Sequence, residues 1–420
     1  MKLKRRLFAI LGPGLLMAAA SIGVSHLVQA TRAGAMYGMD LLLFILLAFV
    51  MKYPTFRFGH EYAHATGQHL LTGFRRQGTW AILLCAVVIF CVMFTGFAAV
   101  LLVTSGLAVI SFDLDLPVAF VAACLCIFSG ACLVAGQYRW MDGIVKILLV
   151  VLFISTITAT VLSVSLIEWK QTDVFTPDVL NRSSLLFLAA LIGFMPAPFE
   201  TCIWQSLWIL EKDKQAKLSR AEVKLDYHIG YFSTLLTAVC FLMLGAAVMH
   251  GSGQQFSSIA AEFSAQLISI YTSLLGQWAK PLIAVAAFAV MLSTVLVIHD
   301  GYPRTVCALI DCFRDEELSE KLRFRIYLAA ILMMILISLS IMLFFIQSFK
   351  TLIDIATTLA FLSAPVLAWL IHRSMHSEDV PAAMRPAPGL TRYSMTCVWA
   401  LTLFAVFYLG LHLFYSPPPT

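Results

Sequence analysis

The chain has 420 residues, of which 60% are hydrophobic and 12% are charged, with a mean hydropathy of +0.89. Soluble domains carry about 25% charged residues, so this composition excludes a soluble protein and predicts a polytopic membrane protein. The net charge of +5 does not indicate a nucleic-acid partner, because the basic residues lie in loops between apolar runs. These runs lack the alternation of a membrane barrel, so we expect an all-α integral membrane protein.

Windows of about 20 apolar residues predict membrane-spanning helices along the whole chain. Because the connecting loops are short, we expect one transmembrane domain over residues 1–420, surrounded by lipid. Eleven spans are predicted, at 8–36, 39–60, 79–107, 117–136, 143–166, 184–209, 227–249, 269–299, 325–348, 351–372 and 393–414.

The charged loops predict an orientation. If the spans alternate, 20 Lys and Arg residues fall on one side of the membrane, and only Lys170, Arg182 and Lys350 fall on the other. The positive-inside rule then places the N-terminus in the cytoplasm and the C-terminus outside. Short loops and termini favour the plasma membrane of a bacterium, its inner membrane.

The first span is interrupted by polar residues in mid-membrane. Gly23 is followed by Ser25 and His26, and then by Gln29 and Arg32. Ser25, Gln29 and Arg32 share one face if the chain is helical there. A charge near the bilayer centre costs about 2.5–3.5 kcal/mol, so these residues indicate a polar cavity.

The sixth span contains a second interruption, in the stretch "LIGFMPAPFE" at 191–200. Pro196 and Pro198 each remove a backbone donor and clash with the preceding turn, so a break is expected over Met195–Phe199. Glu200 follows this break directly. The freed backbone groups must face protein or water, since lipid offers them no hydrogen bonds.

Two broken helices five spans apart predict an inverted repeat, with 8–166 as the first half, 184–372 as the second and 393–414 as an extra helix. Transporters of that design bind their cargo between the broken helices. Two structural kinks, or a simple pairing of Arg32 with Glu200, remain alternatives. The predicted binding residues are Gly23, Ser25, His26, Gln29, Arg32, Gly193, Met195, Ala197 and Glu200.

At these breaks the sequence resembles the natural-resistance-associated macrophage protein (NRAMP) family of divalent-metal transporters. The resemblance lies in "GPGLLM" at 12–17, "RAGAMYG" at 32–38, "ATGQHL" at 65–70 and Met195-Pro196. It implies the LeuT-type fold, with 11 transmembrane helices as two inverted five-helix repeats plus one, and helices 1 and 6 broken at mid-membrane.

The chain departs from the pattern of that family where the metal would bind. The family's Asp-Pro-Gly-Asn aligns with Gly23, Val24, Ser25 and His26, and its Met-Pro-His-Asn aligns with residues 195–198, which read Met-Pro-Ala-Pro. The acidic residues that the family's third helix uses for proton movement have no counterpart in 80–108. The family's route of proton coupling is therefore not expected here.

These observations predict a secondary transporter rather than an enzyme, since no hydrolase, phosphate-loop or nucleophile motif is present, and they indicate no cofactor. The favoured cargo is a divalent transition-metal ion in a rebuilt site made by His26, Met195 and Glu200. The alternative is a non-metal solute, a small anion or an amino-acid-like molecule. Whether a coupling ion takes part stays open.

Several other charged residues lie within or at the ends of spans, and three of them bear on the transport path. Asp300 and Arg304, at the end of the eighth span, are candidates for a cytoplasmic gate, although a helix C-terminal turn would also explain them. Lys52 on the second span either snorkels to the interface or faces the transport path.

Overall fold

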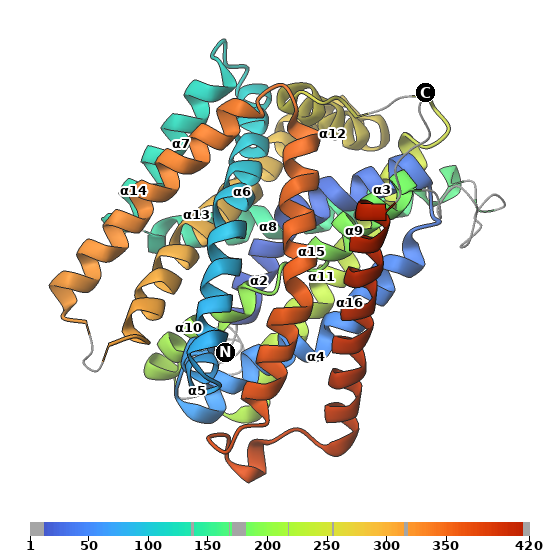
Figure 1. Cartoon of the computed structure of the whole chain (residues 1–420). Coiled ribbons are helices and arrows are strands. Elements are labelled where there is room, and N and C mark those ends of the chain that lie inside the picture. The colour runs from blue at the N-terminus through green and yellow to red at the C-terminus, as the bar shows by residue number, and fades with distance from the viewer. Residues whose placement is uncertain are drawn as a thin grey trace, which may run out of the picture.

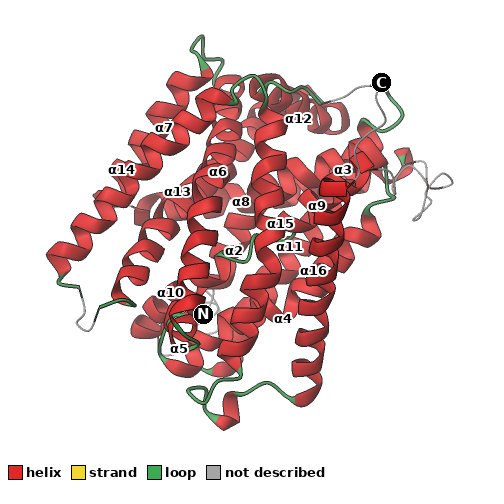
Figure 2. Ribbon diagram, viewed as in Figure 1, coloured by secondary structure: helices red, strands yellow, loops and turns green. Residues whose placement is uncertain are grey.

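The computed structural model describes residues 12–135, 138–167, 169, 182–216, 218–253, 256–314 and 318–414. Within these ranges every regular element is a helix (Figure 2). The elements are α2 (Pro13–Ser21), η1 (Ile22–Ala30), α3 (Thr31–Tyr37), α4 (Leu42–Thr66), α5 (Leu70–Arg76), α6 (Thr79–Ser111), α7 (Val118–Val134), α8 (Tyr138–Ser163), η2 (Val164–Leu166), α9 (Arg182–Phe194), α10 (Thr201–Ala216), α11 (Arg220–Val248), α12 (Ala260–Leu275), η4 (Gln277–Ala279), α13 (Lys280–Asp311), α14 (Glu320–Phe344), α15 (Phe349–Met375), η5 (Ala382–Met384) and α16 (Pro388–Phe414).

The described helices account for the eleven predicted spans. Eight segments are long and apolar enough to cross a membrane, and α7, α8 and the α9–α10 pair supply the other three. In Figure 1, α7 and α14 form one flank of the bundle and α16 lies on the opposite flank. These outer helices expose large apolar side chains such as Phe128, Phe344 and Leu403. An exposed apolar belt is stable only against lipid, so the protein is an integral membrane protein.

The structure corrects the predicted eighth span at 269–299. α12 ends at Leu275, Gly276 adopts a φ of +90°, and α13 runs from Lys280 to Asp311. Figure 1 shows α12 lying across the end of the bundle that is farther from α5. A hydropathy window misses this turn because apolar residues continue on both sides of Gly276, whereas Pro at the start of α13 and a positive-φ glycine mark it.

The first span packs backbone against backbone on α11. A Cβ atom added to Gly230 would overlap the carbonyl oxygen of Gly14, and one added to Gly245 would overlap that of Thr31. Glycine at these positions therefore lets the two helices approach closely, as small residues do between membrane helices. The resulting contact runs along both α2 and α3.

A carboxylate from α11 also holds the start of the first span. Asp226 accepts hydrogen bonds from the backbone N–H groups of Gly12, at 3.0 Å, and Gly14, at 2.7 Å. The first N–H groups of a helix have no partner within the helix and carry partial positive charge. The Asp226 side chain, 1% exposed, satisfies two of them and fixes the entry of α2 into the bundle.

The basic loops gather at the α5 end of the bundle and bind one another there. Arg76 pairs with Asp379 at 2.7 Å, Arg323 pairs with Asp311 at 2.8 Å, and Arg75 donates to the carbonyl oxygen of Cys312 at 3.1 Å. These contacts join α5 to the loops after α13 and α15. Three of the loops predicted to be cytoplasmic are thus joined to one another.

We expect Gly230→Ala to destabilise the protein by about 1–3 kcal/mol, because its methyl group must push α11 away from α2. Gly410→Ala on α16 is the matched control, since nothing lies within 4 Å of the position of its added Cβ. Thermal unfolding of the two purified variants in one detergent measures the difference. Equal unfolding temperatures for the two variants would contradict the close contact between α2 and α11.

Candidate functional site

The predicted break in the sixth span is present between α9 and α10. α9 ends at Phe194, the chain leaves helical geometry over residues 195–200, and α10 begins at Thr201. The peptide bond between Met195 and Pro196 is cis. The hydroxyl of Thr201 donates to the carbonyl oxygen of Pro198 at 2.7 Å, so the first residue of α10 satisfies one backbone group that the break has freed.

The interruption in the first span takes the form of a kink rather than a gap. Gly23 has a φ of −63° and a ψ of −123°, and the chain continues as the π-helix η1. A Cβ on Gly23 would lie 2.8 Å from the hydroxyl oxygen of Thr294 on α13. That hydroxyl donates to the carbonyl oxygen of Ala19 at 3.0 Å. Close approach of α13 therefore requires glycine at the kink and satisfies a carbonyl beside it.

The two interruptions contact each other directly. The hydroxyl of Ser25 lies 3.2 Å from the carbonyl oxygen of Pro196 and also contacts the carbonyl of Ser21. Residues 171 positions apart in the sequence are thus brought together at the breaks.

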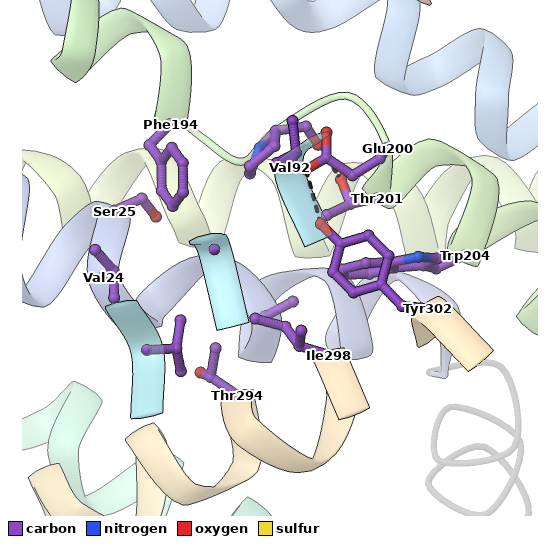
Figure 3. A pocket seen from close by; sticks show the side chains of 14 residues that line it. Val24, Ser25, Val92, Phe194, Glu200, Thr201, Trp204, Thr294, Ile298 and Tyr302 are labelled. Atoms are coloured by element: carbon purple, nitrogen blue, oxygen red, sulfur yellow. Dashed lines mark hydrogen bonds between the residues drawn. The ribbon is translucent and has the colours of Figure 1, made fainter. Parts of the chain in front are cut away.

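A small cavity lies beside this contact, enclosed by α2, η1, α6, the α9–α10 break and α13 (Figure 3). Its volume is about 30 Å³, which is room for about two water molecules. Its polar lining consists of one carboxyl group, three hydroxyl groups, the Tyr302 phenol and the Trp204 indole. The residues that line it are Ala20, Val24, Ser25, Val92, Gly96, Val100, Phe194, Pro198, Glu200, Thr201, Trp204, Thr294, Ile298 and Tyr302.

Glu200 is the one charged residue in this lining, and its side chain is incompletely satisfied. Its Oε1 accepts a hydrogen bond of 3.2 Å from the hydroxyl of Tyr302 (Figure 3). Its Oε2 has no hydrogen-bond partner among the described residues, and the residue is only 1% exposed. Leaving such an oxygen unpaired costs free energy, so this oxygen has room in its hydrogen bonding for a further donor.

Lys52, from the middle of α4, enters the α9–α10 break from the other side. Its Nζ donates to the carbonyl oxygens of Gly193, at 2.7 Å, and Ala197, at 3.2 Å. The side chain is 0% exposed and its ammonium lies 5.0 Å from the centre of the Phe199 ring. Lys52 and Glu200 interact electrostatically, so an amino group and a carboxyl group lie together at this break.

Two of the other predicted binding residues, His26 beside the first kink and Met195 at the sixth-span break, lie outside the cavity lining. His26 is fully buried, with Nδ1 at 2.6 Å from the carbonyl oxygen of Ser21 and Nε2 at 3.0 Å from that of Thr234. Met195 is also fully buried, in the apolar core. The structure therefore brings Ser25 and Glu200 together at the cavity and turns both ring nitrogens of His26 toward backbone carbonyl groups.

Arg32 pairs with a residue other than Glu200. Its Nη1 lies 3.0 Å from Asp354 Oδ1 and 2.7 Å from Gln29 Oε1, and the guanidinium lies 5.3 Å from the centre of the Phe187 ring. The alternative pairing of Arg32 with Glu200 is thus replaced by an ion pair between η1–α3 and α15. Arg32 and Gln29 lie on the α3 side of the kink, outside the lining of the cavity.

The predicted gate residues form an ion pair beside a larger opening. Arg304 Nε lies 2.6 Å from Asp300 Oδ2, and the hydroxyl of Tyr327 donates to Asp300 Oδ1 at 2.7 Å. The adjoining pocket has a volume of about 350 Å³ and is lined by α10, α13 and α14, with Trp208, Arg304 and Tyr327 among its residues. His299, by contrast, is buried and bonds Ser129 at 2.8 Å.

An aromatic pair lies between the cavity and this pocket. Trp204 and Tyr302 pack edge to face with ring centroids 4.8 Å apart, and both line the cavity. Trp208, four residues after Trp204 on α10, and Arg304, two residues after Tyr302 on α13, line the larger pocket. The Trp204–Tyr302 pair thus lines the small cavity, and its neighbours on α10 and α13 line the larger pocket.

Sequence reasoning missed part of this site. Tyr302, Trp204 and Thr294 were not among the predicted binding residues, because neutral side chains in apolar helices give no hydropathy signal. Lys52 was recognised as unusual, but its destination was left open. The signal that could have favoured the interior is its depth, since Lys52 lies ten residues into a 25-residue helix, too far from the α4 termini for snorkelling to be easy.

The chain matches the family described as "Natural resistance-associated macrophage protein-like" over residues 14–411. An uncharacterized protein of Pasteurella multocida is 33% identical over 366 residues, covering 86% of this chain and 84% of that protein. The divalent metal cation transporter MntH of Levilactobacillus brevis is 24% identical over 317 residues, covering 72% of this chain and 65% of that protein. A mutant of the Eremococcus coleocola manganese transporter has a TM-score of 0.72 at 15% identity, over 98% of this chain and 89% of that chain. This last likeness shows that the fold is of the LeuT type.

We expect Tyr302→Phe to destabilise the protein by about 1–3 kcal/mol, because it leaves the buried Glu200 carboxyl group without its donor. The same change should cost less in a Glu200→Gln background, where the acceptor is a neutral amide. Unfolding of the wild type, both single variants and the double variant forms a double-mutant cycle that isolates this contact. An equal effect of Tyr302→Phe in both backgrounds would show that the phenol does not bind the carboxyl group.

Proposed function

The chain belongs to the natural resistance-associated macrophage protein (NRAMP) family of secondary transporters, and on that premise we propose that it carries a small polar organic solute by alternating access. The solute binds where the first and sixth spans are interrupted. We also propose that the protein lies in a bacterial inner membrane with its N-terminus in the cytoplasm, because the basic loops gather at the α5 end.

The observation that carries the proposal is the unpartnered Oε2 of Glu200 beside an enclosed cavity. A buried carboxyl oxygen without a donor favours a ligand that supplies an N–H group, an O–H group or a positive charge. The ammonium group of an amino-acid-like solute has three N–H donors, which is enough to satisfy Oε2 of Glu200.

The remaining lining suits an organic molecule. The hydroxyl groups of Ser25 and Thr294 offer neutral hydrogen bonds, and Phe194 and Trp204 offer apolar surface. Ligand pockets typically combine a mainly apolar wall with a few placed polar groups. The cavity of about 30 Å³ is too small for such a molecule, so we propose that it widens when the helices move.

The same lining is poor in ligands for a bare divalent cation. In the part of the chain that the structure describes, no group of three or more His, Cys, Asp and Glu residues could hold a metal ion. Hard divalent cations need several oxygen ligands and charge compensation. The ammonium of Lys52, which interacts with Glu200, offsets the one negative charge at this site.

A divalent transition-metal ion is the competing cargo, held by His26, Met195 and Glu200. It is supported by the family and by the name of the 24% identical relative from Levilactobacillus brevis. For this cargo to bind, the imidazole of His26 must first turn away from its present contacts with Ser21, Ser25 and Thr234.

Alternating access needs a barrier on each side of the cavity. We propose the Trp204–Tyr302 pair as the inner barrier, and the ion pair of Asp300 and Arg304 as a gate at the pocket beyond it. Cargo that binds Glu200 competes with the Tyr302 hydroxyl for the carboxyl group and so loosens the inner barrier. The two repeats, 8–166 and 184–372, would then move relative to each other, with 393–414 outside both.

An uptake screen in proteoliposomes tests the cargo. The panel contains the amino acids, small amines and small carboxylic acids, together with Mn²⁺, Fe²⁺, Co²⁺, Zn²⁺ and Cd²⁺, each with and without a pH gradient. We expect uptake of an organic solute that Glu200→Gln abolishes, because the amide lacks the charge that binds the solute's donor group. Glu262→Gln, at an exposed position on α12, is the matched control and should leave uptake unchanged.

Met195→Leu separates the two cargoes. It keeps the apolar volume but removes the sulfur, so uptake of an organic solute should stay near the wild-type rate, whereas uptake of a soft metal ion should fall. His26→Ala should stop metal uptake as well, if the imidazole is a ligand. Saturable metal uptake that fails in both Met195→Leu and His26→Ala would overturn the organic cargo and establish the metal ion.

A further inference from the structure

The contacts of Lys52 on α4 with the backbone of the α9–α10 break have no role in the transport scheme described so far. Lys52 is 0% exposed, and its Nζ donates to the carbonyl oxygens of Gly193 and Ala197 at 2.7 and 3.2 Å. The face of the Phe199 ring lies 5.0 Å away and adds a favourable contact for a cation. Burial of an ammonium group is costly, so an arrangement with three compensating partners indicates a specific function.

The partners of Lys52 belong to a distinctive part of the fold. Gly193 lies in the last turn of α9, where carbonyl groups lack partners within the helix and carry partial negative charge. Ala197 lies in the non-helical stretch before α10. In transporters with broken helices, such half-helix ends and unwound carbonyl groups coordinate a coupling cation.

We infer that Lys52 is a built-in cation of the α9–α10 break. Its ammonium occupies the position at which the carbonyl oxygens of Gly193 and Ala197 would otherwise bind a monovalent cation. Because the amino group is covalently attached, it cannot dissociate from the protein as a bound ion does. The transport cycle therefore needs no Na⁺ or K⁺ at this break, and the inference rests on the proposed function only for that last statement.

Gly193 is contacted by α15 on one side and by Lys52 of α4 on the other. A Cβ there would lie 2.8 Å from the Cβ of Phe361 and would also overlap the carbonyl oxygen of Thr357 on α15. α15 thus packs tightly on one side of the break while the Gly193 carbonyl oxygen accepts from Lys52 on α4. The carbonyl group is held in place by the backbone, so removing Lys52 leaves a formed acceptor rather than a collapsed loop.

Replacement of the side chain by exogenous cations tests the inference. In Lys52→Ala the two carbonyl oxygens remain and the space of the side chain is vacated. We expect its unfolding temperature, measured in N-methyl-D-glucamine chloride, to lie below that of the wild type. Titration with Na⁺, K⁺ or ethylammonium at constant ionic strength should raise it saturably, as binding to the folded state requires.

Two companions make the result specific. The wild type should show no such cation-dependent rise, because its own ammonium occupies the site. Lys52→Met, which fills much of the space without charge, should stay at the lower unfolding temperature whichever cation is present. If Na⁺, K⁺ and ethylammonium act equally on Lys52→Ala and on the wild type, or on neither, the inference is overturned.

A measurement on the wild type covers the case in which Lys52→Ala does not fold. Uptake of the solute identified in the screen should proceed at the same rate when N-methyl-D-glucamine replaces all Na⁺ and K⁺. Saturable dependence of wild-type uptake on either ion would contradict the built-in cation. If Lys52→Ala responds to cations while no organic solute is transported, only the proposed function fails; if uptake occurs without that response, only the role of Lys52 fails.

Discussion

The constraint on which the rest of this structure depends is that backbone groups freed in mid-membrane must find partners inside the protein. At each interruption, side chains from other helices donate hydrogen bonds to the freed backbone carbonyl groups. Thr294 on α13 donates to the carbonyl of Ala19 before the kink, Ser25 reaches Pro196 across the two breaks, and Lys52 on α4 donates to Gly193 and Ala197. These long-range contacts fix α4, α13 and the two interrupted spans around one point, and the cavity is what remains between them.

The ionisable residues at the two interruptions have different partners from those that the sequence suggests. Arg32, His26 and Glu200 look like one charged cluster when the chain is read linearly. In the structure Arg32 bonds Asp354, and His26 faces two carbonyl groups. Glu200 is left with Tyr302 and with the field of Lys52. This is the basis on which we propose an organic cargo rather than an ion that brings two positive charges.

The breaks and the spans could be predicted from the sequence because their causes are local. Proline removes a donor at a known position, and a membrane-crossing helix needs a run of apolar residues. The sixth-span break and the all-helical membrane fold are therefore confirmed, whereas the bounds of the eighth span were wrong. Partners across the bundle could not be predicted, since Lys52 and Gly193 are 141 positions apart and no local pattern connects them. The turn at Gly276 was missed for the opposite reason, because its apolar surroundings hide it from any window that averages over 20 residues.

The close contact of the first span with α11 has a mechanical consequence. Interdigitated side chains resist the sliding of one helix along another, because they must change rotamer to pass. Between the first span and α11 the contact is instead between backbone atoms, at Gly14 with Gly230 and at Thr31 with Gly245. A contact of this kind has no interlocked side chains to oppose translation of one helix along the other. With Asp226 holding the start of α2, bending strain would concentrate at the single non-helical residue of the kink, which makes Gly23 the natural pivot.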